Sequence, residues 1–431
     1  MSWELAATLY FGVMLLLLFG GVWIAVSLGA AGVFGIWMVR PALLGGIESV
    51  VWNTVDSFVL TAVPLFLFMG AVILHSGISA RFYRSLAIWL TGVPGGLAQA
   101  NIAACGIFAA LCGSSVATAA AVGAIAIPEM RKRNYGIRPI TGTLAAGGTL
   151  GILIPPSIPF IIYGSTVGES VGKLFIAGIV PGIMMALAFM LFLGIQARFI
   201  PDQLPASAER PTLRQRSSAL FDLAPVIGLI LVVIGGIYAG LMTPTEAAGI
   251  GAAGAVVVAA LYRELTFAVL QRSLLDTLRT NAMILFIVIG AQILSFALVS
   301  AGIPRAIVAT INALDAAPYM VLLLVVAMYL ILGCMVDALS LMLLTLPVVH
   351  PVMMAAGFDP IWFGVVLVIL LEIGLITPPV GVNLFVIQGM ANTTLGEVGW
   401  GALPYVLLLL GGVLVLTLVP DIALWLPRQL F

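Results

Sequence analysis

The sequence has few charged residues. Asp, Glu, Lys and Arg make up 8% of its 431 residues, against roughly 25% in a typical soluble domain. The 17 basic and 17 acidic side chains balance, so we expect no basic surface for nucleic acid. Hydrophobic residues make up 62% and the mean hydropathy is +1.24. Because a water-soluble fold cannot bury so much apolar surface, the composition predicts an integral membrane protein.

Residues suited to enzyme chemistry are also scarce. The three cysteines form no Cys-x-x-Cys pair, and His75 and His350 lie near the ends of apolar segments, where we expect interfacial positions. Neither a disulfide framework, a zinc site nor a catalytic triad is indicated. The segment Gly168–Leu174 resembles a phosphate-binding loop, but it is one residue too short and has leucine in place of Ser or Thr. We therefore expect no enzyme activity and no cofactor.

Long apolar runs recur along the chain. A run of about 20 residues is needed to span hydrocarbon. The runs that approach or exceed this length are Leu5–Val26, Phe58–Leu74, Ile140–Tyr163, Leu174–Ile195, Leu223–Leu241, Ala282–Val299, Tyr319–Val336, Phe363–Thr377 and Leu403–Pro420. They predict an all-α polytopic membrane protein with roughly ten or more crossing segments. No basic leader precedes the first run, so we expect it to be a retained span.

The few basic residues orient these segments. They concentrate in short stretches, which the positive-inside rule places in cytoplasmic loops. Two such loops must be separated by an even number of crossings, and residues 138–198 and 216–263 each have room for two spans. Residues 84–131 are rich in Gly, Ser and Ala and lack two clean spans. We therefore expect a re-entrant helical hairpin there, entering and leaving the membrane on one side.

A polar segment divides the chain into two halves. Residues 201–221 contain the strongest break in composition and are expected to form a cytoplasmic linker. We predict a first half, residues 1–200, with N-terminal scaffold helices and a first hairpin. The second half, residues 222–431, is expected to contain scaffold helices and a second hairpin.

The two halves share a spaced pattern of residues. The pattern is a small or polar cluster, a proline, an apolar span and a double proline. It occurs as Gly113-Ser114-Ser115, Pro128 and Pro155-Pro156, and again as Gly333, Pro347 and Pro378-Pro379. Counting crossings places the two hairpins on opposite sides, which predicts an inverted repeat of the kind found in transporters.

Each double proline is expected to interrupt a helix. Proline lacks the amide donor and disfavours helix at the preceding residue. Freed carbonyls at membrane depth are tolerated only when buried in protein or lining a watery cavity. Such breaks supply carbonyls for Na⁺ and positively biased half-helix N-termini for an anion. The alternative is that each double proline merely kinks a packed helix. The same break in corresponding places of both halves makes this alternative less favoured.

Hydroxyl and acidic side chains near these features are candidate ligands. Ser114, Ser115 and Thr118 can together ligate a hard cation through oxygen, or they simply bond to neighbouring helices. Asp337 is the acidic residue expected at membrane depth, where a charge costs roughly 2.5–3.5 kcal/mol, unless it is a helix cap near an interface. Glu372 is expected on an interior face near Thr377.

Five segments together resemble one transporter family. They are Gly113–Thr118, Ile127–Met130, Gly148–Ser157, Thr243–Ala247 and Ile376–Asn383. Over nearly the whole chain they resemble the large membrane (permease) subunit of tripartite ATP-independent periplasmic (TRAP) transporters, of the C4-dicarboxylate type. Thr243–Ala247 has in addition the local features of a helix start.

The resemblance implies a Na⁺-coupled, elevator-type secondary transporter with two inverted re-entrant hairpins, located in the bacterial or archaeal cytoplasmic membrane. It implies two partners: a small four-helix membrane subunit, expected as a separate chain, and a periplasmic substrate-binding protein. The implied cargo is an organic acid, such as a C4-dicarboxylate or sialic acid. The alternative is a stand-alone carboxylate transporter or antiporter of related fold. A membrane enzyme or a structural subunit is a third interpretation, and it fits the motifs less well.

The resemblance also assigns candidate site residues. The candidates for substrate binding are Ser115, Thr118, Pro156, Ser157, Asp337, Ser340, Thr377 and Asn383. The candidates for Na⁺ are Ser114, Ser115, Thr118, Gly333, Thr377 and Pro378.

Overall fold

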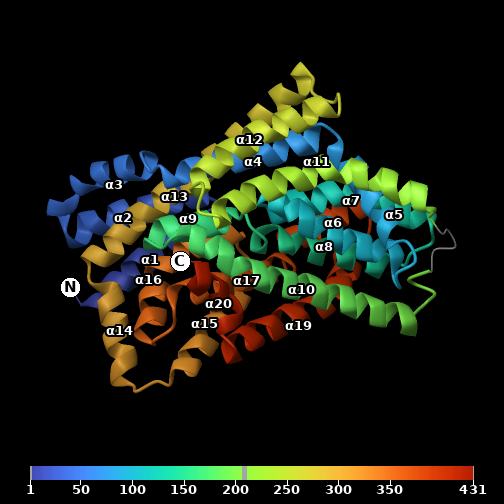
Figure 1. Ribbon diagram of the computed structural model, residues 1–431. Helices are drawn as coiled ribbons and strands as arrows, with labels where there is room; N and C mark the ends of the chain where they lie inside the picture. Colours follow the sequence, from blue (N-terminus) through green and yellow to red (C-terminus); the bar gives the residue numbers. More distant parts are fainter. Residues whose placement is uncertain (1, 206–210, 431) are drawn as a thin grey trace.

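The computed structural model describes residues 2–205 and 211–430, and over these ranges the regular structure is helical (Figure 1). The α-helices are α1 (Trp3–Phe19), α2 (Ile24–Val39), α3 (Gly46–Val55), α4 (Ala62–His75), α5 (Ile78–Leu90), α6 (Gly96–Cys112), α7 (Ser115–Lys132), α8 (Ile137–Leu153), α9 (Ile158–Val167), α10 (Val171–Phe199), α11 (Leu213–Tyr238), α12 (Pro244–Leu261), α13 (Phe267–Ser300), α14 (Ile303–Ala313), α15 (Pro318–Gly333), α16 (Ala338–Ala355), α17 (Pro360–Leu375), α18 (Val382–Ala391), α19 (Leu395–Leu418) and α20 (Asp421–Leu430). The all-α fold class is confirmed.

Fewer helices than expected are long enough to span a membrane. Seven helices of the described chain meet the length and hydropathy of a span, or eight if a pair bent by 49° near residue 57 counts as one. The difference from roughly ten arises because several apolar runs form shorter helices of 10–17 residues. The run Leu5–Val26, for example, was expected as one span, yet α1 ends at Phe19 and α2 begins at Ile24.

Two groups of expected loops are helical instead. Arg81 and Arg84 lie in α5, and Arg272 and Arg279 lie in α13. Helix α11 begins at Leu213, inside the expected linker 201–221, because Thr212 and Gln215 form a reciprocal capping box. Residues 206–210 of that linker lie outside the described residues. Apolarity alone does not predict these helices, because their exposed arginines interrupt the apolar runs.

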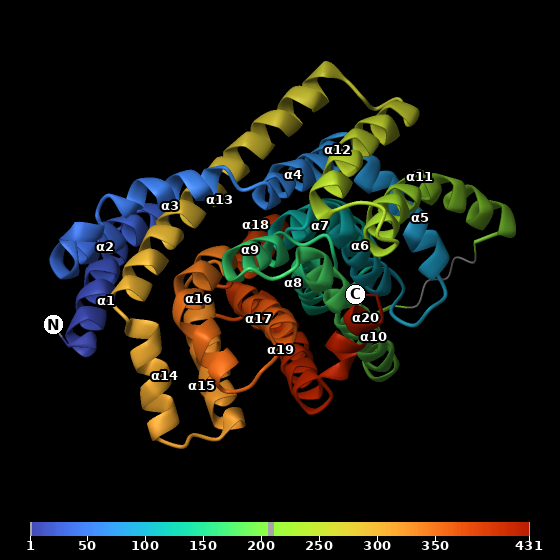
Figure 2. The same ribbon diagram turned by 60° about the vertical axis from the view of Figure 1, so that its left-hand side comes forward.

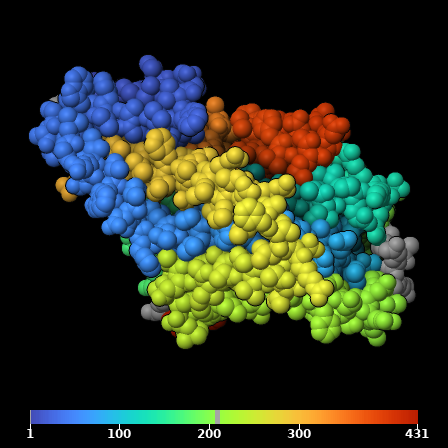
Figure 3. All heavy atoms as spheres, turned by 90° about the horizontal axis from the view of Figure 1, so that it is seen from above, coloured from blue at the N-terminus to red at the C-terminus, as the bar shows by residue number. Residues whose placement is uncertain are grey.

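The helices pack in two groups. We call α1–α4 with α11–α13 the flanking group, and α6–α10 with α15–α20 the hairpin group. In the flanking group α13 packs on α2 and α4, so helices from both halves of the sequence interleave, and the blue and yellow atoms lie side by side along one face (Figure 3). Helices α5 and α14 each lead from a flanking helix into a hairpin (Figure 2).

The hairpin group repeats one order of elements. Helices α6 and α7 form a hairpin, followed by the interrupted pair α8 and α9 and then by α10; α15 and α16, α17 and α18, and α19 follow the same order. Both interruptions contain a cis Pro-Pro bond. The second hairpin helix of each half packs against the short helix of the other, α7 against α18 and α16 against α9. The spaced sequence pattern therefore corresponds to a repeated arrangement of helices.

Candidate transport site

The tip of the first hairpin is built from Gly113 and Ser114. Gly113 has φ +58°, which favours glycine, and a methyl group added there would lie 2.9 Å from the Pro156 carbonyl oxygen. Ser114 caps α7 by accepting a hydrogen bond from the Ala117 amide at 3.4 Å. The tip therefore rests directly on the first double-proline break.

The first break is enclosed by its own half of the chain. Ser157 is fully buried, donates to the Ile152 carbonyl and caps α9 by accepting from the Phe160 amide. A methyl group added at Gly151 would lie 2.9 Å from the Thr118 hydroxyl oxygen. Thr118, Pro156 and Ser157, three of the candidate substrate ligands, thus lie in one packed region.

The second break supplies Asn383 to the first hairpin. After α17 ends at Leu375, Thr377 donates to the Ile373 carbonyl at 2.6 Å. Asn383, on the first turn of α18, is fully buried and its Nδ2 donates to the Ser115 hydroxyl at 2.6 Å. Residues 268 positions apart are therefore joined inside the molecule, and Ser115 and Asn383 are brought together as candidate ligands.

The tip of the second hairpin packs on the second break. The backbones of Gly333 and Gly374 are so close that a methyl group on Gly374 would lie 2.7 Å from the Gly333 carbonyl oxygen. The Val380 amide donates to the Cys334 carbonyl at 3.0 Å. Asp337 caps α16 by accepting from the Ser340 amide at 3.1 Å; its position at membrane depth stays a prediction.

Several buried oxygen atoms near these tips have no hydrogen-bond partner. They are Thr118 Oγ1, Ser340 Oγ and Asn383 Oδ1. Most buried polar atoms in proteins are satisfied, so such exceptions mark candidate ligand positions. Hydroxyl and amide oxygens suit a hard cation. Among the described residues no cluster of three or more His, Cys, Asp or Glu side chains is present that could hold a metal ion.

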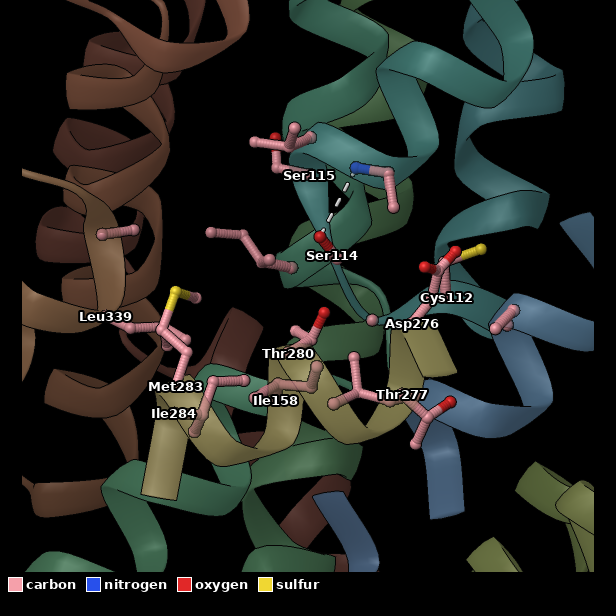
Figure 4. Close-up of a pocket in the computed structure, with 18 of the residues that line it drawn as sticks. Cys112, Ser114, Ser115, Ile158, Asp276, Thr277, Thr280, Met283, Ile284 and Leu339 are labelled. Atoms are coloured by element: carbon pink, nitrogen blue, oxygen red, sulfur yellow. Dashed lines mark hydrogen bonds between the residues drawn. The ribbon is translucent and has the colours of Figure 1, made fainter. Parts of the chain in front are cut away.

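A cavity of about 730 Å³ lies between the two helix groups. Ser114 and Ser115 form part of one wall, Leu339 part of a second, and Thr280, Met283 and Ile284 of α13 a third (Figure 4). Asp337 also lines the cavity. The candidates Thr118, Ser157, Ser340 and Asn383 are buried and do not line the cavity. Both hairpins therefore border one space, although most of the candidate ligands do not line it directly.

The flanking wall of the cavity contains charged residues that sequence reasoning missed. His75 of α4 and Asp276 of α13 form a hydrogen bond at 2.6 Å, and Arg279 lies one turn further along α13. The expected interfacial role of His75 did not include this partner. Arg279 is expected in a loop because it precedes the apolar run, whereas the structure places it in α13, three residues after Asp276 and on the same helix face.

Interrupted helices that meet around a cavity define a class of polytopic helical membrane transporters. The family model described as "Tripartite ATP-independent periplasmic transporter, DctM component" matches residues 11–422. The chain therefore belongs to this family and is a transporter permease of the bacterial inner membrane, not an enzyme.

Two relatives and one solved structure illustrate the similarity. The chain is 38% identical over 408 residues to the C4-dicarboxylate TRAP transporter large permease protein DctM of Pseudomonas aeruginosa, covering 94% of each chain. It is 37% identical over 402 residues to the 2,3-diketo-L-gulonate TRAP transporter large permease protein YiaN of Escherichia coli, covering 93% of each. The YdaH transporter of Alcanivorax borkumensis has a similar fold, with a TM-score of 0.57 at 16% identity over 88% of this chain and 89% of that one.

Proposed function

We propose that this permease imports an organic acid, driven by Na⁺, by moving its hairpin group relative to its flanking group. The hydrogen bond from Asn383 to Ser115 carries the proposal, because it joins the tip of one hairpin to the opposite broken helix beside unpaired buried oxygens. Such a junction is the place where inverted-repeat transporters hold substrate and coupling ion.

Na⁺ is the proposed coupling ion. Around the first tip, Ser114, Ser115 and Thr118 offer hydroxyl and carbonyl oxygens, and around the second break Gly333, Thr377 and Pro378 offer carbonyls and one hydroxyl. All are neutral oxygen donors, which suit a hard monovalent ion better than a transition metal. Each set includes residues at the tip of one hairpin of the repeat, and the second set also includes two residues of the second break.

A carboxylate is the proposed cargo. The N-termini of α7, α9, α16 and α18 all begin at the tips and breaks, and helix N-termini favour anions. Arg279 and His75 add basic groups to the flanking wall of the cavity. A C4-dicarboxylate, the cargo named for the Pseudomonas relative, is the first candidate; sialic acid and similar carboxylates are the others.

The elevator movement rests on the two-group packing. We propose that the hairpins are re-entrant and inverted, and that α5 and α14 connect the moving hairpin group to the fixed flanking group. Gly70 of α4 makes a close contact across this boundary: an added methyl group would lie 2.8 Å from the Cys112 Cα. Gly70→Ala should therefore displace the first tip and lower uptake at least about tenfold, or about 1.4 kcal/mol.

The matched control for Gly70→Ala is Gly228→Ala, since nothing lies within 4 Å of a methyl group added at Gly228. Uptake into proteoliposomes measures both variants. Equal activity of the two would contradict movement across the Gly70 contact.

The family is tripartite, and we propose as the other two components a separate small four-helix membrane subunit and a periplasmic binding protein that delivers the acid. Exposed apolar side chains along α11 and α13 are available to lipid or to the small subunit.

Reconstitution tests the function as a whole. Proteoliposomes containing this chain, the small subunit and the loaded binding protein should accumulate substrate only with an inward Na⁺ gradient. Ser115→Ala combined with Asp337→Asn should abolish uptake while the complex stays folded. Uptake indifferent to Na⁺ would refute the coupling, and uptake without the binding protein would favour a stand-alone carrier.

A further inference from the structure

Glu372 is an acid inside the hairpin group that the proposed transport site does not use. Its side chain is 0% exposed, and neither carboxylate oxygen bonds to any described group. Every residue of α17 from Ile361 to Leu375 is buried, and Glu372 is the one acidic or basic residue of this helix. The acid is therefore sealed in an apolar helix near the centre of the group.

The direction of Glu372 follows from the helix geometry. Gly374 faces α15, because its backbone touches Gly333. Two residues along an α-helix correspond to a rotation of about 200°, so Glu372 points away from the contact between Gly374 and Gly333. Helices α8, α10 and α19 are further neighbours of α17. Glu372 is also absent from the cavity wall, which α17 reaches only through Leu375.

No counter-charge accompanies Glu372 on those neighbours. Arg138 of α8, Lys173 and Arg198 of α10 and Glu397 of α19 all lie in end turns of their helices. Tyr405 of α19 is buried, and no described group forms a hydrogen bond with the Glu372 carboxylate. His350 of α16 and Tyr329 of α15 lie on helices that also pack against α17, and neither forms a hydrogen bond with Glu372.

An ionised carboxylate is costly in such a place. The effective penalty for burying an unpaired ion is several kcal/mol, and a buried acid usually avoids it by becoming neutral. A bound metal cation would need several oxygen ligands directed at it, and among the described residues Glu372 belongs to no cluster of three or more His, Cys, Asp or Glu side chains that could hold a metal ion.

We propose that Glu372 is a proton-binding site within the hairpin group, holding its carboxyl group neutral in the state seen here. Resting on the proposed function, this means that the hairpin group crosses the bilayer without a charge at Glu372. Glu372 then adds nothing to the charge that moves in each cycle.

Infrared spectroscopy of the purified complex tests the proposal. The C=O stretch of a protonated carboxyl should be present from about pH 6 to about pH 9, above the ordinary range of glutamic acid. It should disappear in the isosteric variant Glu372→Gln and remain in Glu48→Gln, a matched change at an exposed acid of α3. Absence of the band, or its appearance only after Na⁺ is removed, would overturn the proposal; the latter result would assign a cation to the site.

Uptake gives an independent readout. Glu372→Gln keeps the neutral shape and should retain uptake within about twofold of the unmodified protein. A loss of uptake greater than tenfold in a folded Glu372→Gln complex would overturn permanent protonation. Such a loss would mean that the carboxyl group must release its proton during transport, which the amide of glutamine cannot do. If Na⁺-driven uptake is absent in the unmodified protein, the transport proposal fails while the infrared band still decides the state of Glu372.

Discussion

At the first double-proline break Pro155, Pro156 and Ser157 are buried, whereas at the second break Pro378, Pro379 and Val380 are exposed. Both segments contain a cis Pro-Pro bond and precede a ten-residue helix. The first break is covered by the first hairpin tip and by α10, while the second is held mainly by Cys334 and Gly333 of the second hairpin. The repeated sequence thus specifies the same local backbone at both breaks. The packing around them in this conformational state buries one break and exposes the other.

Thiol labelling measures the inequality most directly. Val380→Cys should react with a maleimide at least about 100-fold faster than Ser157→Cys, because a buried thiol reacts only after local opening. Each variant is made in a chain whose three native cysteines are replaced by alanine. Similar rates at the two positions would show that the breaks are equally open in solution.

The bond between Ser115 and Asn383 links the two unequal regions. Ser115→Ala leaves the buried Asn383 amide unpaired, at a cost of about 1–3 kcal/mol, and should lower uptake about tenfold. In a double-mutant cycle with Asn383→Ala the coupling should reach about 0.5–3 kcal/mol. Thr310→Ala on α14, which loses only a bond to its own helix, is the control. Additive effects of the two site variants would contradict a direct link.

Two matched glycine substitutions compare the stability of the breaks. A methyl group at Gly178 of α10 would lie 2.8 Å from the Leu153 carbonyl oxygen and 2.6 Å from the Phe160 ring. We expect Gly178→Ala to lower the free energy of unfolding by about 1–3 kcal/mol.

At Gly399 of α19 the nearest atom is the ring Cγ of the exposed Pro378, at 3.3 Å, so Gly399→Ala should cost less than about 0.5 kcal/mol. Thermal unfolding in detergent measures both variants. An equal loss would mean that the exposed break is as rigidly packed as the buried one.

The sequence predicted the parts whose geometry is local. The first hairpin, both breaks and the Thr243 capping box follow from proline, glycine and capping chemistry within a few residues, and the capping box is observed. The split of Leu5–Val26 was missed because glycine and valine at residues 20–22 leave the run apolar.

The cavity wall was missed for another reason. Asp276 and His75 are paired only by the packing of α4 against α13, and their separation of 201 residues leaves no local signal. Asp337 lines the cavity, and its carboxylate caps a helix, because the backbone amide of Ser340 is within reach. The residues expected to bind Na⁺ and substrate remain predictions.

The bond from Asn383 to Ser115 also bears on how the protein is made. Ser115 is synthesised 268 residues before Asn383, whose side chain donates to it. The first hairpin is therefore made before its partner Asn383 exists. The transport site therefore does not exist in any fragment that ends before α18. Two separately expressed halves, divided in the segment 201–221, would have to associate before either contained a complete site.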